Sequence, residues 1–176
     1  IITGGDSGLG RAAAVAFVKE GAKVVIPYYD EHRDAMETKE YIEKLGGQCE
    51  LLSGDISDKN FCKYIVDFTL KKFGKIDILV NNAGIAIDTL VEDKTKDNFI
   101  KTLEVNTIAP FLLMKKIGLK MKENKYGNIV NISSTNGIDT IYPESLDYDA
   151  SKAALISVSK NMAQYLAPYV RVNTVC

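Results

Sequence analysis

Short, almost purely apolar segments alternate with longer amphipathic segments along this chain, and this alternation limits the possible folds more than any other feature. Several of the short segments are nearly continuous runs of Val, Ile and Leu, which is typical of parallel strands covered on both faces. The predicted strands are residues 23–29, 48–54, 76–81, 128–133 and 170–175. Residues 1 and 2 resemble the end of a further strand.

The segments between these strands have helical periodicity. The predicted helices cover residues 9–20, 34–45, 58–73, 99–123 and 148–166. Ser57 is the predicted N-cap of the third helix, and Pro110 predicts that the fourth is bent or divided into two. Strands and helices in this order predict an α/β fold, a single domain over residues 1–176 with an open, doubly wound parallel sheet. Ligands of such sheets bind at the carboxyl ends of the strands.

Composition narrows the range of functions. Lys and Arg number 22 and Asp and Glu 23, so no excess charge favours nucleic acid or an anionic membrane as a partner. No apolar run is long enough to predict a membrane span. Cys49, Cys62 and Cys176 lack the spacing of a metal or redox motif, which favours a reducing, cytoplasmic location. With His32 as the single histidine, a Ser-His-Asp hydrolase or a histidine-rich zinc site is hard to build, so no metal site is predicted.

A glycine-rich loop follows the first apolar residues and precedes the first predicted helix. It reads T-G-G-D-S-G-L-G over residues 3–10, with Gly4, Gly8 and Gly10 at the key spacing. Glycines allow close approach of a phosphate, and the free N–H groups of a helix amino terminus favour anions. An ordinary tight turn is the simpler interpretation, but a strand before the loop and a helix after it favour a pyrophosphate site.

The most reactive pattern is Y-x-x-x-K, formed by Tyr148 and Lys152. On a helix these residues share one face, where the ammonium would stabilise a phenolate that exchanges a proton with an alcohol or carbonyl. A surface helix pair is the simpler alternative. Ser134, at the end of a predicted strand, could hold the substrate oxygen against the tyrosine. Ser133 competes for that role, and because adjacent strand residues face opposite sides, we expect only one of them to reach the substrate.

These motifs together resemble the short-chain dehydrogenase/reductase family, in the order that the family has them. The resemblance also rests on Asp55, on the N-N-A-G segment at residues 81–84, and on Asn106, which could otherwise be a solvated helix residue. It implies a Rossmann-type fold and a hydride transfer between NAD(P) and a carbonyl or alcohol, with Tyr148 as general acid or base. The implied catalytic residues are Asn106, Ser134, Tyr148 and Lys152.

The same resemblance implies the cofactor-binding residues, with Asp55 and Ile56 near adenine and Lys152 near the nicotinamide ribose. The full set is Gly4, Asp6, Ser7, Gly8, Leu9, Gly10, Tyr28, Tyr29, Asp55, Ile56, Asn82, Ala83, Gly84, Tyr148 and Lys152. The positions that choose between NAD and NADP are Tyr28 and Tyr29, and neither is charged. Asp30 comes next and is the type of residue that binds the ribose 2′-hydroxyl of NAD, and Asp6 would repel an extra phosphate if it faces that site. Both favour NAD, although Arg33 leaves NADP open.

Two other functions share parts of this pattern. A sugar-nucleotide epimerase or dehydratase also uses Y-x-x-x-K, although its glycine spacing usually differs. A regulator could keep the dinucleotide-binding fold without catalysis, but it would not need the proton-transfer residues.

The family resemblance also implies a homo-oligomer, commonly a tetramer, that acts on a small-molecule substrate. Apolar residues of the last two predicted helices would supply the interface, although a core role is the simpler interpretation: Phe111, Leu112, Leu155, Ile156 and Met162. Only two apolar residues precede Thr3, and Cys176 follows directly on a predicted strand, whereas strands usually have about 5–6 residues and a turn behind them. We therefore expect a chain truncated at both ends, without the family's C-terminal substrate-covering part.

Overall fold

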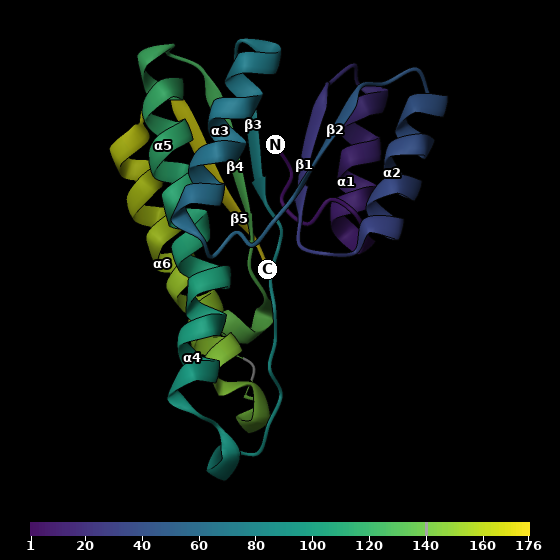
Figure 1. Ribbon diagram of the computed structural model, residues 1–176. Coiled ribbons are helices and arrows are strands. Elements are labelled where there is room, and N and C mark those ends of the chain that lie inside the picture. Colours follow the sequence, from purple (N-terminus) through teal and green to yellow (C-terminus); the bar gives the residue numbers. More distant parts are fainter. Residues whose placement is uncertain (140) are drawn as a thin grey trace.

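The computed structural model describes residues 1–139 and 141–176 (Figure 1). The predicted strands and helices are present with slightly shifted bounds, except that the segment 99–123 is divided. In chain order the main elements are α1 (Gly8–Lys19), β1 (Val24–Tyr28), α2 (His32–Lys44), β2 (Cys49–Ser53), α3 (Lys59–Phe73), β3 (Ile78–Asn81), α4 (Lys96–Leu103), α5 (Ala109–Glu123), β4 (Gly127–Ile132), α6 (Leu146–Leu166) and β5 (Val170–Val175). The order confirms the α/β fold.

The strands are parallel and fall into two paired sets, β1 with β2 and β3 with β4 and β5. The first residues of the chain lie between the sets. The N–H of Ile2 donates to the carbonyl of Val25 at 3.0 Å, and the N–H of Thr3 donates to the carbonyl of Val80 at 3.0 Å. Ile2 also forms a parallel bridge with Val80, as a strand end would. The resulting order across the fold is β2, β1, residues 1–3, β3, β4 and β5.

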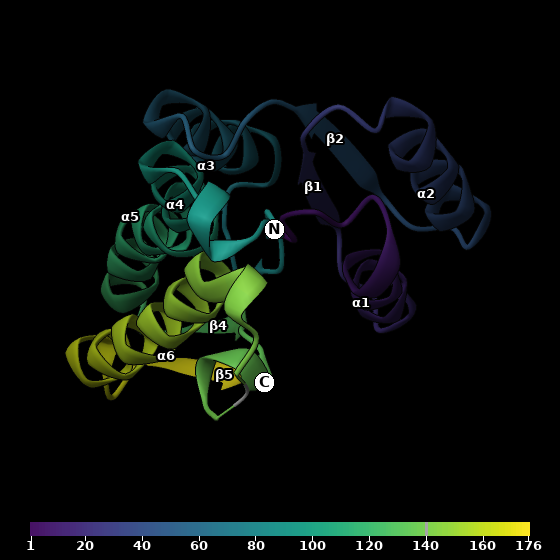
Figure 2. The same cartoon turned by 90° about the horizontal axis from the view of Figure 1, so that it is seen from below.

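Helices cover both faces of these strands, and Figure 2 shows α1 and α2 together on one side and α3, α5 and α6 on the other. Each face has its own apolar core. The core beneath α3, α5 and α6 includes Val25, whereas the core beneath α1 and α2 includes its neighbours Val24 and Ile26. Side chains of a strand alternate between faces, so a continuous apolar strand can fill both cores. The doubly wound arrangement predicted from the sequence is confirmed.

Two local predictions have different outcomes. The segment 99–123 is divided as Pro110 predicted: α4 ends at Leu103, a π-helical segment η2 (Glu104–Ile108) follows, and Pro110 lies in the first turn of α5, where a missing N–H is tolerated. The N-cap of α3 was predicted wrongly. Asp58 is the cap and accepts a hydrogen bond from the N–H of Asn60, while the Ser57 hydroxyl donates to Asp55 instead.

No helix within the described ranges is long and apolar enough to cross a membrane.

Candidate active site

The glycine-rich loop lies at the carboxyl end of the central strands and leads directly into α1. Gly4 and Gly8 have positive φ angles of 61° and 51°, which L side chains rarely adopt. Gly10 is required for a different reason, because a Cβ there would lie 2.1 Å from the carbonyl oxygen of Gly4. Gly10 therefore lets the helix pack beneath the loop, while Gly4 and Gly8 shape the loop itself.

The N-N-A-G segment holds this loop in place. The Asn82 side chain donates to the carbonyl oxygens of Thr3 at 3.0 Å and Gly4 at 2.9 Å. In return, the Thr3 hydroxyl oxygen accepts hydrogen bonds from the backbone N–H groups of Asn82 at 3.0 Å and Ala83 at 3.1 Å. Two motifs almost eighty residues apart therefore form one rigid junction between the two sets of strands.

A cleft of about 550 Å³ opens at this junction. Its lining includes twelve of the predicted cofactor residues: Gly4, Asp6, Ser7, Gly8, Leu9, Tyr28, Tyr29, Asp55, Ile56, Asn82, Ala83 and Gly84. Gly10, Tyr148 and Lys152 are not part of this lining. Pro27, Glu31, Gly54, Ile85, Lys101 and Val105 also line the cleft and were not predicted.

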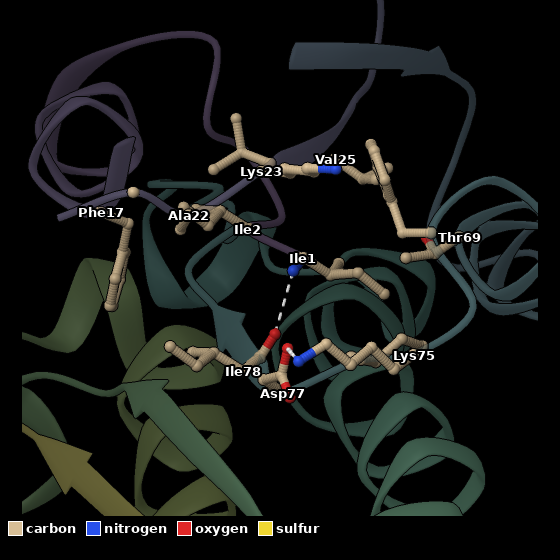
Figure 3. Close-up of a pocket in the computed structure, with 14 residues that line it drawn as sticks. Ile1, Ile2, Phe17, Ala22, Lys23, Val25, Thr69, Lys75, Asp77 and Ile78 are labelled. Carbon is tan, nitrogen blue, oxygen red and sulfur yellow. Dashed lines mark hydrogen bonds and ion pairs between the residues drawn. The ribbon is translucent and has the colours of Figure 1, made fainter. Parts of the chain in front are cut away.

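A second cavity, of about 290 Å³, lies at the opposite end of the strands (Figure 3). Its lining includes residues that precede β1 and β3, such as Ala22 and Lys75, together with residues of α1, α3 and the two strands. The amino group of Ile1 donates there to the carbonyl of Ile78 at 2.9 Å. None of the predicted site residues is among the described residues that line it. Since ligands of parallel sheets bind at the carboxyl ends of the strands, the cleft at the glycine-rich loop is the better candidate.

Tyr148 and Lys152 lie in the first two turns of α6. The Lys152 Nζ is 5.4 Å from the centre of the Tyr148 ring and donates to the carbonyl of Ile132 at 2.8 Å. Burial lowers the pKa of the Lys152 ammonium to about 8. A Cβ on Gly84 would lie 3.3 Å from this Nζ. Gly84 thus belongs both to the cleft wall and to the surroundings of Lys152, which connects the cleft to the Tyr148–Lys152 pair.

Asn106 lies in the π-helical segment and is fully buried, so the alternative of a solvated side chain is wrong. Its amide oxygen accepts from the N–H of Ile85 at 2.8 Å, and its amide nitrogen donates to the Ile85 carbonyl at 2.8 Å and to the Ser151 hydroxyl at 3.0 Å. The side chain therefore holds the segment after the N-N-A-G motif against α6. Its backbone carbonyl cannot receive the usual helical bond from residue 110, which is proline.

The two candidate serines have different surroundings. Ser133 is buried, and its hydroxyl donates to the backbone carbonyl of Lys152 at 2.9 Å, which fastens β4 to α6. Ser134 is partly exposed, and its hydroxyl donates to the Asn136 side chain at 3.2 Å. The Ser134 hydroxyl also accepts from the backbone N–H of Asn136 at 3.2 Å, so both hydroxyls are hydrogen-bonded, but only that of Ser133 is bonded to the backbone of α6.

Asp55 follows β2 and forms an ion pair across the cleft wall. Its carboxylate lies 2.6 Å from the Nζ of Lys101 and accepts two hydrogen bonds from Ser57, through the backbone N–H and the hydroxyl. Burial works against ionisation of Asp55, but these hydrogen bonds and the Lys101 charge outweigh it and lower the pKa. Lys101 comes from α4, 46 residues away in sequence, and no sequence motif points to it.

The residues near Tyr28 and Tyr29 carry little free positive charge. The Tyr28 hydroxyl lies 2.9 Å from Nδ1 of His32. Arg11 donates to the backbone carbonyl of Asp6 at 2.9 Å, and Arg33 donates to Glu37 at 3.0 Å. Arg11 is thus bonded to the backbone of the glycine-rich loop, and neither arginine is among the residues that line the cleft. Across residues 1–139 and 141–176, no group of three or more His, Cys, Asp or Glu side chains could hold a metal ion.

Comparison with known proteins identifies the family to which this chain is similar. A family model described as short chain dehydrogenase matches residues 1–176. An uncharacterized oxidoreductase, YhxC of Bacillus subtilis, is 41% identical over 99% of this chain, which spans 61% of that relative's length. The structure of acetoin dehydrogenase YohF from Salmonella typhimurium is similar with a TM-score of 0.92 and 28% identity, over 99% of this chain and 70% of that one. A metagenomic short-chain oxidoreductase in complex with NADP has a TM-score of 0.91 and 29% identity, over 98% and 78% of the two chains.

Proposed function

The chain belongs to the short-chain dehydrogenase family, and from this premise we propose that the protein transfers a hydride between NAD(P) and a carbonyl or alcohol substrate. The observation that carries the proposal is the buried Lys152 ammonium, which lies beside the Tyr148 ring and next to Gly84 of the cleft wall. The three free cysteines agree with a reducing compartment, so the proposed location is the cytoplasm.

The cleft has the size and chemistry that a dinucleotide needs. Its volume lies within the usual range for small-molecule sites, roughly 300–1,000 Å³. A Cβ on Gly8 would have no heavy atom within 4 Å, so the loop and the amino terminus of α1 leave open space for a pyrophosphate. Asp55 and Ile56 would hold the adenine end, and Lys152 the nicotinamide ribose. When bound, the nicotinamide supplies or accepts the hydride.

The proton is transferred by residues of the protein itself. In the reducing direction, the Tyr148 hydroxyl donates its proton to the substrate oxygen, and the Lys152 ammonium stabilises the phenolate that remains. In the oxidising direction, the phenolate accepts the proton of the alcohol. The Ser134 hydroxyl would turn from Asn136 to the substrate oxygen and hold it during either step. Asn106 fixes the segment after the N-N-A-G motif through Ile85.

The test is a nicotinamide absorbance assay on the complete natural protein with a panel of ketones and alcohols. Acetoin and its diketone belong in the panel, because a structural neighbour is an acetoin dehydrogenase. Oxidation or reduction of the cofactor that depends on substrate supports the proposal. A regulator would bind the cofactor without turnover, and an epimerase or dehydratase would convert sugar nucleotides without net change in nicotinamide absorbance.

For the cofactor, we expect NADH to bind more tightly than NADPH. Asp6 is only 7% exposed, lines the cleft, and forms no ion pair in the described part of the chain, so its carboxylate would repel a 2′-phosphate. A repulsion of about 1.4 kcal/mol would weaken NADPH binding tenfold. Fluorescence titration of both cofactors measures the preference, and Asp6→Asn should reduce it. Tighter binding of NADPH would overturn the proposal and make Arg11 or Arg33 the phosphate partner.

For the assembly, we propose a homo-oligomer, commonly a tetramer in this family, with α5 and α6 at the interface. Phe111 and Leu119 of α5 are 37% and 38% exposed, and Ile108 at the end of the preceding π-helical segment is also exposed, which leaves an apolar surface uncovered. Leu155 was wrongly assigned to the interface, because it is 1% exposed and belongs to the core under α6. Sedimentation of the complete protein should give a mass above one protomer. A monomer at micromolar concentration would contradict the expectation.

A further inference from the structure

A buried ion pair involves Asp147, the residue that precedes Tyr148, and has no part in the chemistry described above. The Lys94 Nζ is 2.9 Å from the Asp147 carboxylate, and these side chains are 5% and 0% exposed. The second carboxylate oxygen of Asp147 accepts a hydrogen bond from the Thr102 hydroxyl at 2.7 Å. Burial opposes ionisation of Asp147, but the bonds from Lys94 and Thr102 outweigh it and lower the pKa. The three residues form one charged cluster, here called the Lys94–Thr102–Asp147 cluster.

The cluster joins three parts of the chain. Lys94 also donates to the backbone carbonyl of Ile87, in the segment that follows the N-N-A-G motif. Thr102 belongs to α4, and Asp147 to the first turn of α6. The segment that follows the N-N-A-G motif is also bonded to the residues just before α6, because the N–H of Thr89 donates to the carbonyl of Glu144 at 3.2 Å. The cluster therefore fixes the start of α6 against α4 and against the segment that follows the N-N-A-G motif.

A buried ion pair adds little net stability to a fold, because the free energy needed to remove two charges from water offsets most of their attraction. Its position suggests what it does instead, since Asp147 immediately precedes Tyr148. Among the hydrogen bonds of the described residues, none involves the Tyr148 hydroxyl, whereas its backbone carbonyl accepts one from Ser151 at 2.7 Å. The placement of the phenol consequently depends on the backbone of this first helical turn.

We propose that the Lys94–Thr102–Asp147 cluster positions Tyr148 for proton transfer by locking the first turn of α6. The proposal rests on the proposed role of Tyr148 as general acid or base. Thr102, Asp147 and Lys94 are positioning residues, because they act through the helix backbone and not on the substrate. A displacement of about 1 Å at a reacting group can cost roughly 10²-fold in rate, so loosening this turn lowers kcat more than it weakens cofactor binding.

The test replaces Thr102 in the complete natural protein, because valine keeps the shape and removes only the hydroxyl. Thr102→Val should lower kcat at least about tenfold while the cofactor Kd changes little, and Thr102→Ser should restore most of kcat. The matched control is Thr69→Val, which removes a buried hydroxyl that donates to Ile65 at 2.7 Å in α3, far from the site. Unchanged kcat in Thr102→Val, or an equal loss in Thr69→Val, overturns the proposal.

A second measurement does not depend on turnover. Amide hydrogen exchange of the peptide covering residues 145–152 should be faster in Thr102→Val than in wild type, and unchanged in Thr69→Val. If exchange in this peptide is the same in all three proteins, the cluster does not lock the turn. If the wild type turns over no substrate in the panel but exchange increases as expected, the proposed function fails and the structural role of the cluster stands.

Discussion

Tyr148→Phe is expected to remove nearly all turnover in the complete protein while leaving cofactor affinity almost unchanged. The substitution deletes only the phenolic oxygen, and positioned proton transfer is typically worth 10²–10⁴-fold, so roughly that loss in kcat should follow. Steady-state kinetics and a fluorescence titration of the cofactor measure the two effects separately. A variant that kept more than about a tenth of wild-type kcat would rule out the proton-transfer role.

Lys152→Ala provides the contrast to that variant. We expect it to lower both kcat and cofactor affinity, because one ammonium would serve the phenolate and the nicotinamide ribose. The loss also leaves the Ile132 carbonyl without its 2.8 Å donor, so the folded fraction of each variant should be checked by circular dichroism before the kinetics are compared.

Gly10→Ala is expected to abolish tight cofactor binding and to destabilise the fold. The new Cβ would lie 2.1 Å from the Gly4 carbonyl oxygen and 2.5 Å from the Asn82 amide nitrogen, so α1 and the glycine-rich loop must separate. Overpacking of this kind costs about 1–3 kcal/mol or more in the free energy of unfolding. Loss of even one charge-assisted hydrogen bond to the pyrophosphate, about 1.5–3 kcal/mol, lowers affinity by at least about tenfold.

The matched control for this prediction is Gly21→Ala, at the other end of α1. Gly21 has a φ of 87° and no heavy atom within 4 Å of an added Cβ. Alanine there is strained by about 1–2 kcal/mol but does not touch the loop, so stability should fall while cofactor affinity stays the same. Equal cofactor affinity in Gly10→Ala and wild type would show that the loop tolerates the displacement and does not cradle the pyrophosphate.

The strands and most of the helices follow from the sequence because their signals are local. A strand buried on both faces must be apolar throughout, as Val24, Val25 and Ile26 are. The division of the segment 99–123 also follows from a local signal. Pro110 lacks an N–H wherever it stands, so it interrupts helical hydrogen bonding without reference to distant residues. The cap of α3 was missed because Ser57 and Asp58 are both good capping residues, and the choice between them depends on Asp55, which takes the Ser57 hydroxyl.

Those parts of the candidate site that depend on the folded chain could not be predicted. Lys101 reaches Asp55 across 46 residues, and Lys94 reaches Asp147 across 53, so neither pair leaves a pattern at helical or strand spacing. Asn106 could be identified by resemblance, but its two hydrogen bonds to Ile85 depend on how α4 and α5 pack. Leu155 was misassigned because helical periodicity does not distinguish an apolar residue that faces the core from one that faces another protomer.

The junction between the two sets of strands, β1 with β2 and β3 with β4 and β5, gives the proposed cofactor a further role. Residues 1–3 bridge the sets, and the cleft takes Tyr28 and Asp55 from one side and Asn82 and Gly84 from the other. A dinucleotide bound across this junction would hold both sides together and would add about 2.7 kcal/mol of stability at a concentration a hundredfold above Kd. Proteolysis follows the population of opened molecules when opening is rapid. The resistance of such a protein to proteolysis would therefore rise with the concentration of its nucleotide.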